Sequence, residues 1–204
     1  MAYVLGFFAA DGYMTVNKRG GQFWCIQIND KELLKQIKTV IESDHKISIK
    51  TKKRVHLSYR IQIGSVEMCD DLRQLGYNER KTYSLSIPNI PNNCFNDFVR
   101  GYFDGDGNVW TGYVHKERET KLLAIQTVFT SCSEKFLNSL KFKLDAFDIN
   151  KGVLSKGRGN YYRLTYSINN SLKLYDFMYN SLGTSRLFLK RKKGVFEKYI
   201  KMRL

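Results

Sequence analysis

Two stretches of this sequence share one pattern: Val4-Leu5-Gly6-Phe7-Phe8-Ala9-Ala10-Asp11-Gly12 and Val99-Arg100-Gly101-Tyr102-Phe103-Asp104-Gly105-Asp106-Gly107. Each has a glycine followed by two large apolar or aromatic residues, and each ends in Asp-Gly. The first glycines of the two stretches, and their last aspartates, are both 95 positions apart. An internal repeat sets the architecture of a chain. The sequence therefore predicts two similar halves related by an approximate two-fold axis.

Both stretches suit a helix, and each places small residues three or four positions apart, on one helix face. Gly6 is followed by Ala9 and Ala10, and Gly101 by Gly105. Glycine inside a helix costs about 1 kcal/mol relative to alanine, so two such helices indicate close packing that offsets the loss. If the helices pack in parallel, their C-terminal ends meet.

Asp11 and Asp106 lie at those ends. A carboxylate at a helix C-terminus faces an unfavourable dipole, and two neighbouring carboxylates repel each other. A bound divalent cation would relieve both costs. The alternative is an ordinary turn that ends each helix, with Gly12 as the C-terminal cap, since Asp-Gly is a common turn dipeptide. Two copies in matched contexts favour the metal site.

The segments that follow each motif also repeat. The first copy predicts a helix over residues 2–12, helices capped by Asp30 and Ser65, and strands over residues 13–17, 23–28, 47–51 and 57–63. The second copy places Ser133 where the first has Asp30 and predicts strands over residues 109–114, 122–130, 152–155 and 161–168. The predicted fold class is α+β, with two pseudo-symmetric αββαββα repeats and antiparallel sheets.

The only two prolines, Pro88 and Pro91, lie between the repeats, where a linker is expected. The predicted domains are residues 1–85 for the first repeat, 86–97 for the linker and 98–204 for the second repeat.

The chain is strongly basic, with a formal net charge of +15 and a pI near 9.6. Residues 1–98 carry 14 basic and 10 acidic residues, whereas residues 99–204 carry 20 and 9, most densely from Arg186 to Arg203. An excess of this size indicates a polyanionic partner, and it favours nucleic acid over a membrane surface.

Other classes of protein are disfavoured. The four cysteines show no CxxC spacing, so no zinc site is expected. No apolar run approaches the roughly 20 residues of a membrane span. The start, Met1-Ala2-Tyr3, lacks the basic region of a secretory signal. We therefore expect an intracellular protein, in the cytoplasm of a prokaryote or in an organelle.

The two motifs resemble the paired signature of LAGLIDADG homing endonucleases. Residues 80–88 resemble the join between the halves of single-chain members, and Leu189-Lys190-Arg191-Lys192-Lys193 resembles their C-terminal basic element. The resemblance covers essentially the whole chain. The first motif departs from the family pattern at Ala9, where the pattern has an aspartate, but it keeps Asp11.

The resemblance implies a site-specific endonuclease that hydrolyses one phosphodiester in each strand of double-stranded DNA. The sheets would form a DNA-binding saddle around the two signature helices. Asp11 and Asp106, with the adjoining Gly12 and Gly107, would hold Mg²⁺ or Mn²⁺, and Ca²⁺ could occupy the site without supporting cleavage. Such a cation activates water and stabilises charge on the scissile phosphates.

The resemblance also implies supporting residues. Each half would supply a polar residue near the end of its second strand that positions water. The candidates are Gln27, Asn29 and Asp30 in the first half and Thr130, Ser131 and Ser133 in the second. The supporting basic residue of each half is assigned to Lys81 and Lys192, each of which follows an arginine. Gln27, Lys81 and Lys192 therefore join the two aspartates as candidate catalytic residues.

Base readout is expected from side chains on strands and turns, about half of which face the DNA because strand side chains alternate. The candidates are Gln22, Trp24, Lys50, Lys52, Arg54, Arg60, Gln62, Lys121, Gln126, Arg158, Tyr162 and Arg163. Trp24 and Tyr162 fit a core position equally well. Contacts from lysine to phosphate would add affinity that falls steeply with salt.

Two alternatives share this fold. One is an intron maturase, which would bind its intron RNA and assist splicing. The other is a DNA-binding protein that has lost catalysis, although both motif aspartates are present here. Because the two halves differ, we expect a monomer on a long asymmetric DNA site.

Overall fold

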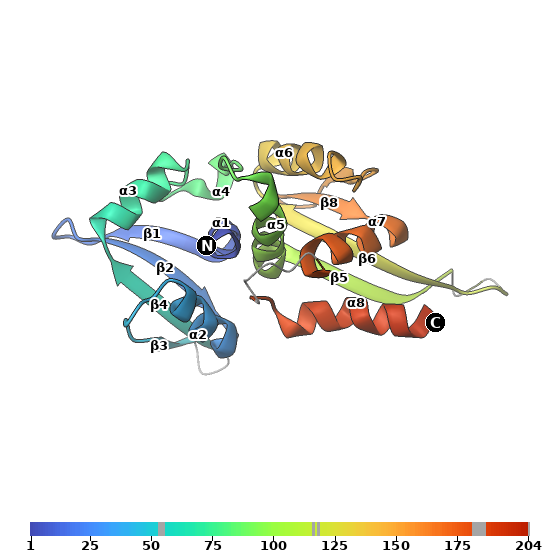
Figure 1. Cartoon of the computed structure of the whole chain (residues 1–204), viewed down its shortest axis with the longest axis horizontal. Helices are drawn as coiled ribbons and strands as arrows, with labels where there is room; N and C mark the ends of the chain where they lie inside the picture. The colour runs from blue at the N-terminus through green and yellow to red at the C-terminus, as the bar shows by residue number, and fades with distance from the viewer. Residues whose placement is uncertain (53–55, 116, 118, 181–186, 204) are drawn as a thin grey trace.

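The computed structural model describes residues 1–52, 56–115, 117, 119–180 and 187–203. Arg54 and Arg186 lie outside these ranges, and the side chain of Lys52 is not described either. Two four-stranded antiparallel sheets flank a central pair of helices (Figure 1). The α+β class and the two-repeat architecture predicted from the sequence are confirmed.

The first half follows the predicted order of elements. It contains α1 (Ala2–Asp11), β1 (Gly12–Val16), β2 (Gln22–Ile28), α2 (Lys31–Val40), β3 (Ser48–Lys52), β4 (His56–Gly64), α3 (Val66–Gln74) and the short α4 (Lys81–Ser84). Its strand order is β1-β2-β4-β3, so the second strand of each hairpin lies at the centre of the sheet.

The second half repeats this plan with the strand order β5-β6-β8-β7. Its elements are α5 (Asn92–Asp106), β5 (Gly107–Val114), β6 (Leu122–Ser131), α6 (Glu134–Asp145), β7 (Val153–Lys156), β8 (Tyr162–Tyr166), α7 (Ile168–Tyr175), the π-helical turn η1 (Asp176–Asn180) and α8 (Lys190–Arg203). Helix α5 begins inside the segment predicted as linker, and α7 already begins at Ile168, where a strand was predicted to continue.

Hydroxyl and carboxylate caps begin the helices that follow each sheet hairpin. Asp30 Oδ1 accepts from the backbone N–H of Leu33 at 2.9 Å, and Ser133 Oγ accepts from that of Phe136 at 3.2 Å. These side chains satisfy amide groups that have no partner within the helix. The equivalent placement predicted for Asp30 and Ser133 is confirmed.

Gly12 follows the last residue of α1 as its C-terminal cap, as expected, and its backbone N–H donates to the Phe8 carbonyl. Its backbone is extended, with φ −80° and ψ 157°, because β1 begins directly at this residue. Glycine is required here for space: a β-carbon on Gly12 would lie 2.1 Å from the Phe8 ring. Gly107 has the same conformation and the same conflict with the Phe103 ring, at 2.2 Å.

Helices α1 and α5 pack against each other at the centre of the molecule, between the two sheets (Figure 1). A β-carbon on Gly6 would lie 2.0 Å from the carbonyl oxygen of Phe98, and one on Gly101 would lie 2.0 Å from that of Tyr3. Each glycine thus lets the opposite backbone approach. The close packing predicted from the small residues is confirmed.

Each sheet buries one face beneath its helices. In the first half Trp24, Ile26 and Ile61 face Leu34 and Ile37 of α2 in the core. In the second half the corresponding buried residues are Ile125, Phe129, Leu164, Phe136, Leu137 and Leu140. The pleat sends alternate side chains to the opposite face, which leaves that face of both sheets available for a partner.

Candidate functional site

Asp11 and Asp106 are the last residues of α1 and α5, and both keep part of their surface open to solvent. The Asp11 carboxylate lies against α5, since a β-carbon on Gly105 would be 3.3 Å from its Oδ2. Burial of the carboxyl group, followed by the nearby charge of Asp11, raises the pKa of Asp106 to about 6. Burial also raises the pKa of Asp11. The two helix ends therefore bring two mutually repelling carboxylates together.

A lysine closes the C-terminal end of each signature helix. Lys81 Nζ donates to the carbonyl oxygens of Ala9 at 2.7 Å and Ala10 at 3.4 Å. It is only 8 % exposed. Its ammonium group supplies donors to carbonyls that the helix itself leaves without a partner.

Lys192 closes α5 more completely. Its Nζ donates to the carbonyl oxygens of Phe103, Asp104, Gly105 and Gly107 at 2.6, 2.8, 3.3 and 2.6 Å. It is 5 % exposed. Burial lowers the pKa of both lysines to about 8.

The charges of these groups are paired crosswise. Lys192 is the cation that most lowers the pKa of Asp11, whereas Lys81 is the one that most lowers the pKa of Asp106. Of the two helix-terminal aspartates, each lysine therefore acts more strongly on the one of the other half, although the carboxylate that most raises the pKa of Lys192 is Asp104 of its own half. The two halves share one electrostatic site.

The donor set suits a hard divalent cation. Carboxylate oxygens are ligands that Mg²⁺ and Mn²⁺ prefer, and Mg²⁺ keeps several waters and takes substrate phosphates as further ligands. Within the described ranges, no group of three or more His, Cys, Asp or Glu residues could hold a metal. Two protein carboxylates with open positions fit a cation that is completed by water and phosphate.

Gly12 and Gly107 occupy equivalent positions directly after the two motif aspartates. Both begin a strand, opposite Ile26 and Phe129 respectively. The Gly107 carbonyl accepts a hydrogen bond from the Lys192 ammonium, which would repel a cation at that oxygen. The Gly107 carbonyl is therefore already hydrogen-bonded in this structure, and the glycine lets α5 turn directly into β5.

Gln27 lies in a cavity of about 380 Å³ that also contains Asp11 and opens between the two halves. The other polar residues that line it are Asn29, Asp30, Asp104 and Arg191. Gln27 Nε2 donates to Ser58 Oγ at 2.9 Å, which holds the amide on the open face of the first sheet. Gln27 is thus within the same cavity as the first motif carboxylate.

Two polar candidates of the second half, Ser131 and Ser133, have structural partners, whereas the Thr130 side chain lies opposite Arg163 on the open face of the sheet. The Thr130 carbonyl accepts from the Tyr102 hydroxyl at 2.8 Å. Ser131 Oγ accepts from the Ser133 N–H at 3.1 Å, and Ser133 Oγ donates to the Leu85 carbonyl at 2.9 Å. The two halves therefore surround their aspartates with different polar groups.

Sequence reasoning missed Arg191 as a cavity residue. It is exposed and lines the cavity from the start of α8. The basic run at residues 190–193 was the available signal, but the run alone does not show which residue turns toward the carboxylates.

On the first sheet, strand register separates the candidate DNA-binding residues. Residues directly opposite each other in a ladder share a face, and Gln27 pairs with Arg60 while Cys25 pairs with Gln62. Lys50 pairs with Ser58, the partner of Gln27. Lys50, Arg60 and Gln62 therefore lie on the face away from the helices.

Trp24 and Gln22 lie on the other face, so their assignment to DNA contact is corrected. Trp24 is 3 % exposed, and its Nε1–H donates to Met68 Sδ of α3 at 3.1 Å. Gln22 shares this face by strand alternation and is half-buried. The alternative of a core position for Trp24 is confirmed.

On the second sheet, Gln126 and Arg163 are exposed and face away from the helices, paired with Trp110 and Thr130. Trp110 is 46 % exposed on this face and was not predicted to lie there. Tyr162 instead shares the face of Leu164, so its assignment to DNA contact is also corrected.

Lys121 and Arg158 are exposed next to the strands, Lys121 just before β6 and Arg158 between β7 and β8.

A family model described as a LAGLIDADG-like domain matches residues 1–74 and 96–178, which covers both repeats. This chain belongs to the LAGLIDADG family. The match includes both signature helices and both sheets, so the family assignment rests on the same elements that form the site. No curated protein matches the sequence.

Solved structures share the LAGLIDADG fold over nearly the whole chain. The meganuclease I-AabMI bound to uncleaved DNA has a TM-score of 0.66 at 17% identity and covers 98% of this chain and 89% of its own. I-SmaMI bound to uncleaved DNA in the presence of calcium ions has a TM-score of 0.62 at 16% identity and covers 98% of this chain and 89% of its own. I-SmaMI bound to cleaved DNA has a TM-score of 0.65 at 16% identity and covers 98% of this chain and 87% of its own.

Within the described part of this LAGLIDADG protein, no helix has both the length and the apolar character needed to cross a bilayer.

Proposed function

We propose that this protein is a site-specific endonuclease that hydrolyses one phosphodiester in each strand of double-stranded DNA. The observation that carries the proposal is the pair of carboxylates at the ends of α1 and α5, each beside a buried lysine anchored on a helix end. Folding alone does not favour two like charges at two helix C-termini. The unfavourable electrostatic energy of the two carboxylates would be offset by a bound divalent cation, which a DNA phosphate could also contact.

Asp11 and Asp106 would hold the cation, Mg²⁺ or Mn²⁺ in the active protein and Ca²⁺ in an inactive one. When bound, such a cation lowers the pKa of water and offsets the charge of a scissile phosphate. Lys81 and Lys192 hold ammonium groups beside the carboxylates, where each can stabilise negative charge that develops on phosphate oxygens. Gln27 presents an amide in the Asp11 cavity, where it can orient water.

The open faces of the two sheets would bind the DNA. They carry Lys50, Arg60, Gln62, Gln126 and Arg163, which can reach base edges in the major groove. The net charge of +15 supports strong, salt-sensitive attraction to phosphate. Because the two faces differ in sequence, a single chain would recognise a long asymmetric site. I-AabMI and I-SmaMI share this fold and were solved bound to DNA, which supports DNA as the partner.

The test is cleavage of a randomised duplex library with Mg²⁺ and with EDTA, with the ends sequenced. We expect cuts at one long motif that require metal and are lost in Asp11→Asn and in Asp106→Asn. The matched control is Asp71→Asn, which changes an exposed carboxylate of α3 and should cut normally.

Tight, salt-sensitive DNA binding without cleavage under any divalent metal would contradict the proposal and favour a silent DNA-binding protein. Selective binding of an intron RNA, with splicing that persists in the aspartate variants, would favour a maturase.

A further inference from the structure

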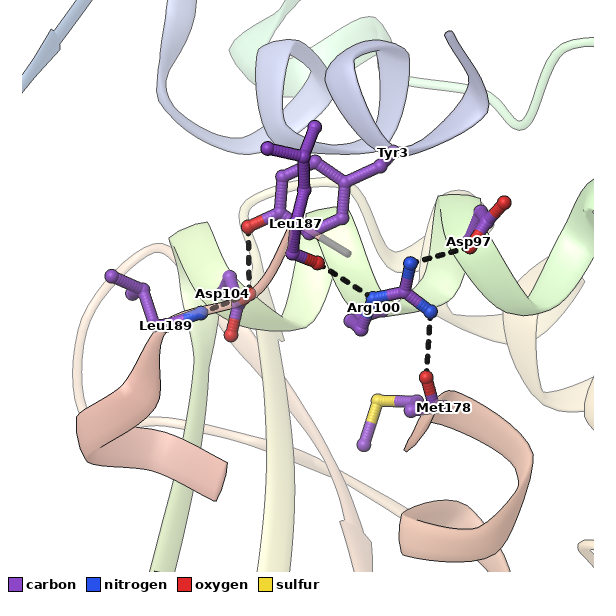
Figure 2. Close-up of polar contacts among 7 residues, drawn as sticks. All are labelled: Tyr3, Asp97, Arg100, Asp104, Met178, Leu187 and Leu189. Atoms are coloured by element: carbon purple, nitrogen blue, oxygen red, sulfur yellow. Dashed lines mark hydrogen bonds and ion pairs between the residues drawn. The ribbon is translucent and has the colours of Figure 1, made fainter. Parts of the chain in front are cut away.

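A buried network ties the segment before α8 to helix α5 (Figure 2). Arg100, fully buried, donates from Nε to the Leu187 carbonyl at 2.8 Å and from Nη1 to the Met178 carbonyl at 2.6 Å. One helical turn further along α5, Asp104 Oδ2 accepts from the backbone N–H of Leu189 at 2.8 Å. We name residues 187–189 the strap. Arg100 and Asp104 hold it at both ends.

The strap leads directly to Lys192. The Leu189 carbonyl accepts from the backbone N–H of Lys192 at 3.0 Å and from that of Lys193 at 3.2 Å, which begins α8. The Lys192 side chain then returns to the end of α5 and donates to its carbonyls. The path from α5 through the strap to Lys192 and back is therefore closed by hydrogen bonds.

The first half lacks this clamp. The two motifs are 95 positions apart, so Leu5 occupies the position equivalent to Arg100, and Ala9 the position equivalent to Asp104. Neither of these side chains can form a hydrogen bond. The segment before Lys81 is instead held by backbone hydrogen bonds to residues close to it in the sequence. Gly76, at φ +89°, donates to the Arg73 carbonyl at 2.9 Å, as is common where a helix ends. The two lysines are equivalent in place but differ in how they are held.

We infer that Asp104 and Arg100 are positioning residues for Lys192, and that through it they serve the cleavage of one DNA strand and not the other. The inference rests on the proposed endonuclease function. Asp104 is 2 % exposed, and its Oδ2 also accepts from the Tyr3 hydroxyl at 2.7 Å, so its bonded oxygen is turned into the protein. Asp104 also borders the cavity that contains Asp11, and the asparagine variant described below separates its charge there from its hold on the strap.

The experiment is strand-resolved, single-turnover cleavage of a duplex labelled on both strands. Lys192→Met and Lys81→Met first identify which strand depends on which lysine. Asp104→Ala, which gives the second motif the residue of the first, should slow the Lys192-dependent strand about tenfold or more, because small displacements of a reacting group cost rates of this size. The other strand should stay within about twofold, so nicked DNA should accumulate.

Two further variants separate positioning from charge. Asp104→Asn keeps an oxygen that can accept from Leu189 and should restore most of the strand-specific rate. Tyr3→Phe removes the other hydrogen bond to the same Asp104 oxygen and leaves the strap contact in place, so it should not change the ratio of the two strand rates. If Asp104→Ala slows both strands equally, or if Asp104→Asn fails as completely as Asp104→Ala, the positioning role is wrong.

Hydrogen exchange tests the clamp without any cleavage. In Asp104→Ala, amides of the strap and of the first turn of α8 should exchange faster, while those of residues 75–81 should not change. Unchanged exchange at the strap would overturn the inference even in an active enzyme. If the wild-type protein cuts no DNA, the proposed function fails, and the exchange experiment still decides whether the clamp exists.

Discussion

The carbonyl oxygen of Tyr3 occupies the space that a side chain on Gly101 would need: a β-carbon there would lie 2.0 Å from it. Gly6 stands in the same relation to Phe98. Tyr3 and Phe98 are themselves equivalent by the spacing of 95 positions, so the contact obeys the two-fold symmetry of the repeats. The helix interface therefore depends on two close backbone approaches, to which the side-chain hydrogen bond from Tyr3 to Asp104 is added.

We predict that Gly101→Ala lowers the free energy of unfolding by about 3 kcal/mol, since overpacking a close contact costs roughly this much. Gly194→Ala in α8 is the matched control. Nothing lies within 4 Å of its β-carbon position, so the helix preference of alanine should make it neutral or stabilising by up to about 1 kcal/mol. Urea unfolding measures both. Equal effects for the two substitutions would contradict the packing argument.

We predict that Asp106→Asn stabilises the metal-free protein at neutral pH. Its folded pKa of about 6 lies above the unfolded value near 3.8, so the folded state binds more protons in this window. The free energy of unfolding therefore falls as pH rises from about 4 to 6 and stays low above it. Burial also raises the pKa of Asp104 to about 6, so the variant should keep part of the fall in unfolding free energy between pH 4 and 6.

The gain for Asp106→Asn should be about 1 kcal/mol or less, because solvent screens a partly exposed carboxylate. Thermal unfolding against pH measures it. Mg²⁺ should raise the melting temperature of the wild type and have a smaller effect on the variant. A variant that is less stable than the wild type at pH 7.5 without metal would contradict the assigned repulsion.

We predict that Lys192→Met destabilises the protein more than Lys81→Met. Lys192 Nζ contacts four backbone carbonyls, whereas Lys81 Nζ contacts two. Hydrogen bonds to a charged group contribute about 1.5–3 kcal/mol to stability. A buried carbonyl left without a donor adds the cost of its own desolvation. Chemical unfolding should show a loss of about 3 kcal/mol for Lys192→Met and about half that for Lys81→Met. The reverse order would show that the contacts of Lys192 do not contribute to stability.

We predict that Arg163→Ala weakens DNA binding and reduces its salt dependence. Arg163 is exposed on the open face of the second sheet. Lys135→Ala is the control, since Lys135 carries the same charge and is exposed on α6, which covers the opposite face. Each phosphate contact contributes to the slope of affinity against salt. Binding titrations at several salt concentrations should separate the variants, and equal losses would argue for a purely nonspecific attraction.

Much of this fold could be predicted because the same pattern occurs twice. The glycines, the capping residues Asp30 and Ser133, and the alternating strands each have a local physical cause, and the second copy confirms the first. The motif aspartates were singled out because their position at helix ends is electrostatically unfavourable. Lys81 and Lys192 were identified from the resemblance, and the structure shows that both reach the ends of the signature helices.

The remaining features depend on contacts between distant residues. The sequence left Trp24 and Tyr162 open between the DNA face and the core, because an aromatic residue fits either face of a strand and only the register decides. Arg100 has a local partner in Asp97, but the sequence gave no sign that it also reaches carbonyls 78 and 87 positions away. The position of Arg191 depended on where α8 begins.

The buried hydrogen bond from Tyr3 to Asp104 crosses from one half of the chain to the other, over 101 positions. Its consequence concerns the exchange of halves between related proteins. A chimera that brought in a first half with phenylalanine at this position would leave the Asp104 carboxylate with one donor fewer inside the protein. The two halves of this chain are therefore matched to each other, and recombination that preserves the sheets can still disrupt the seam between them.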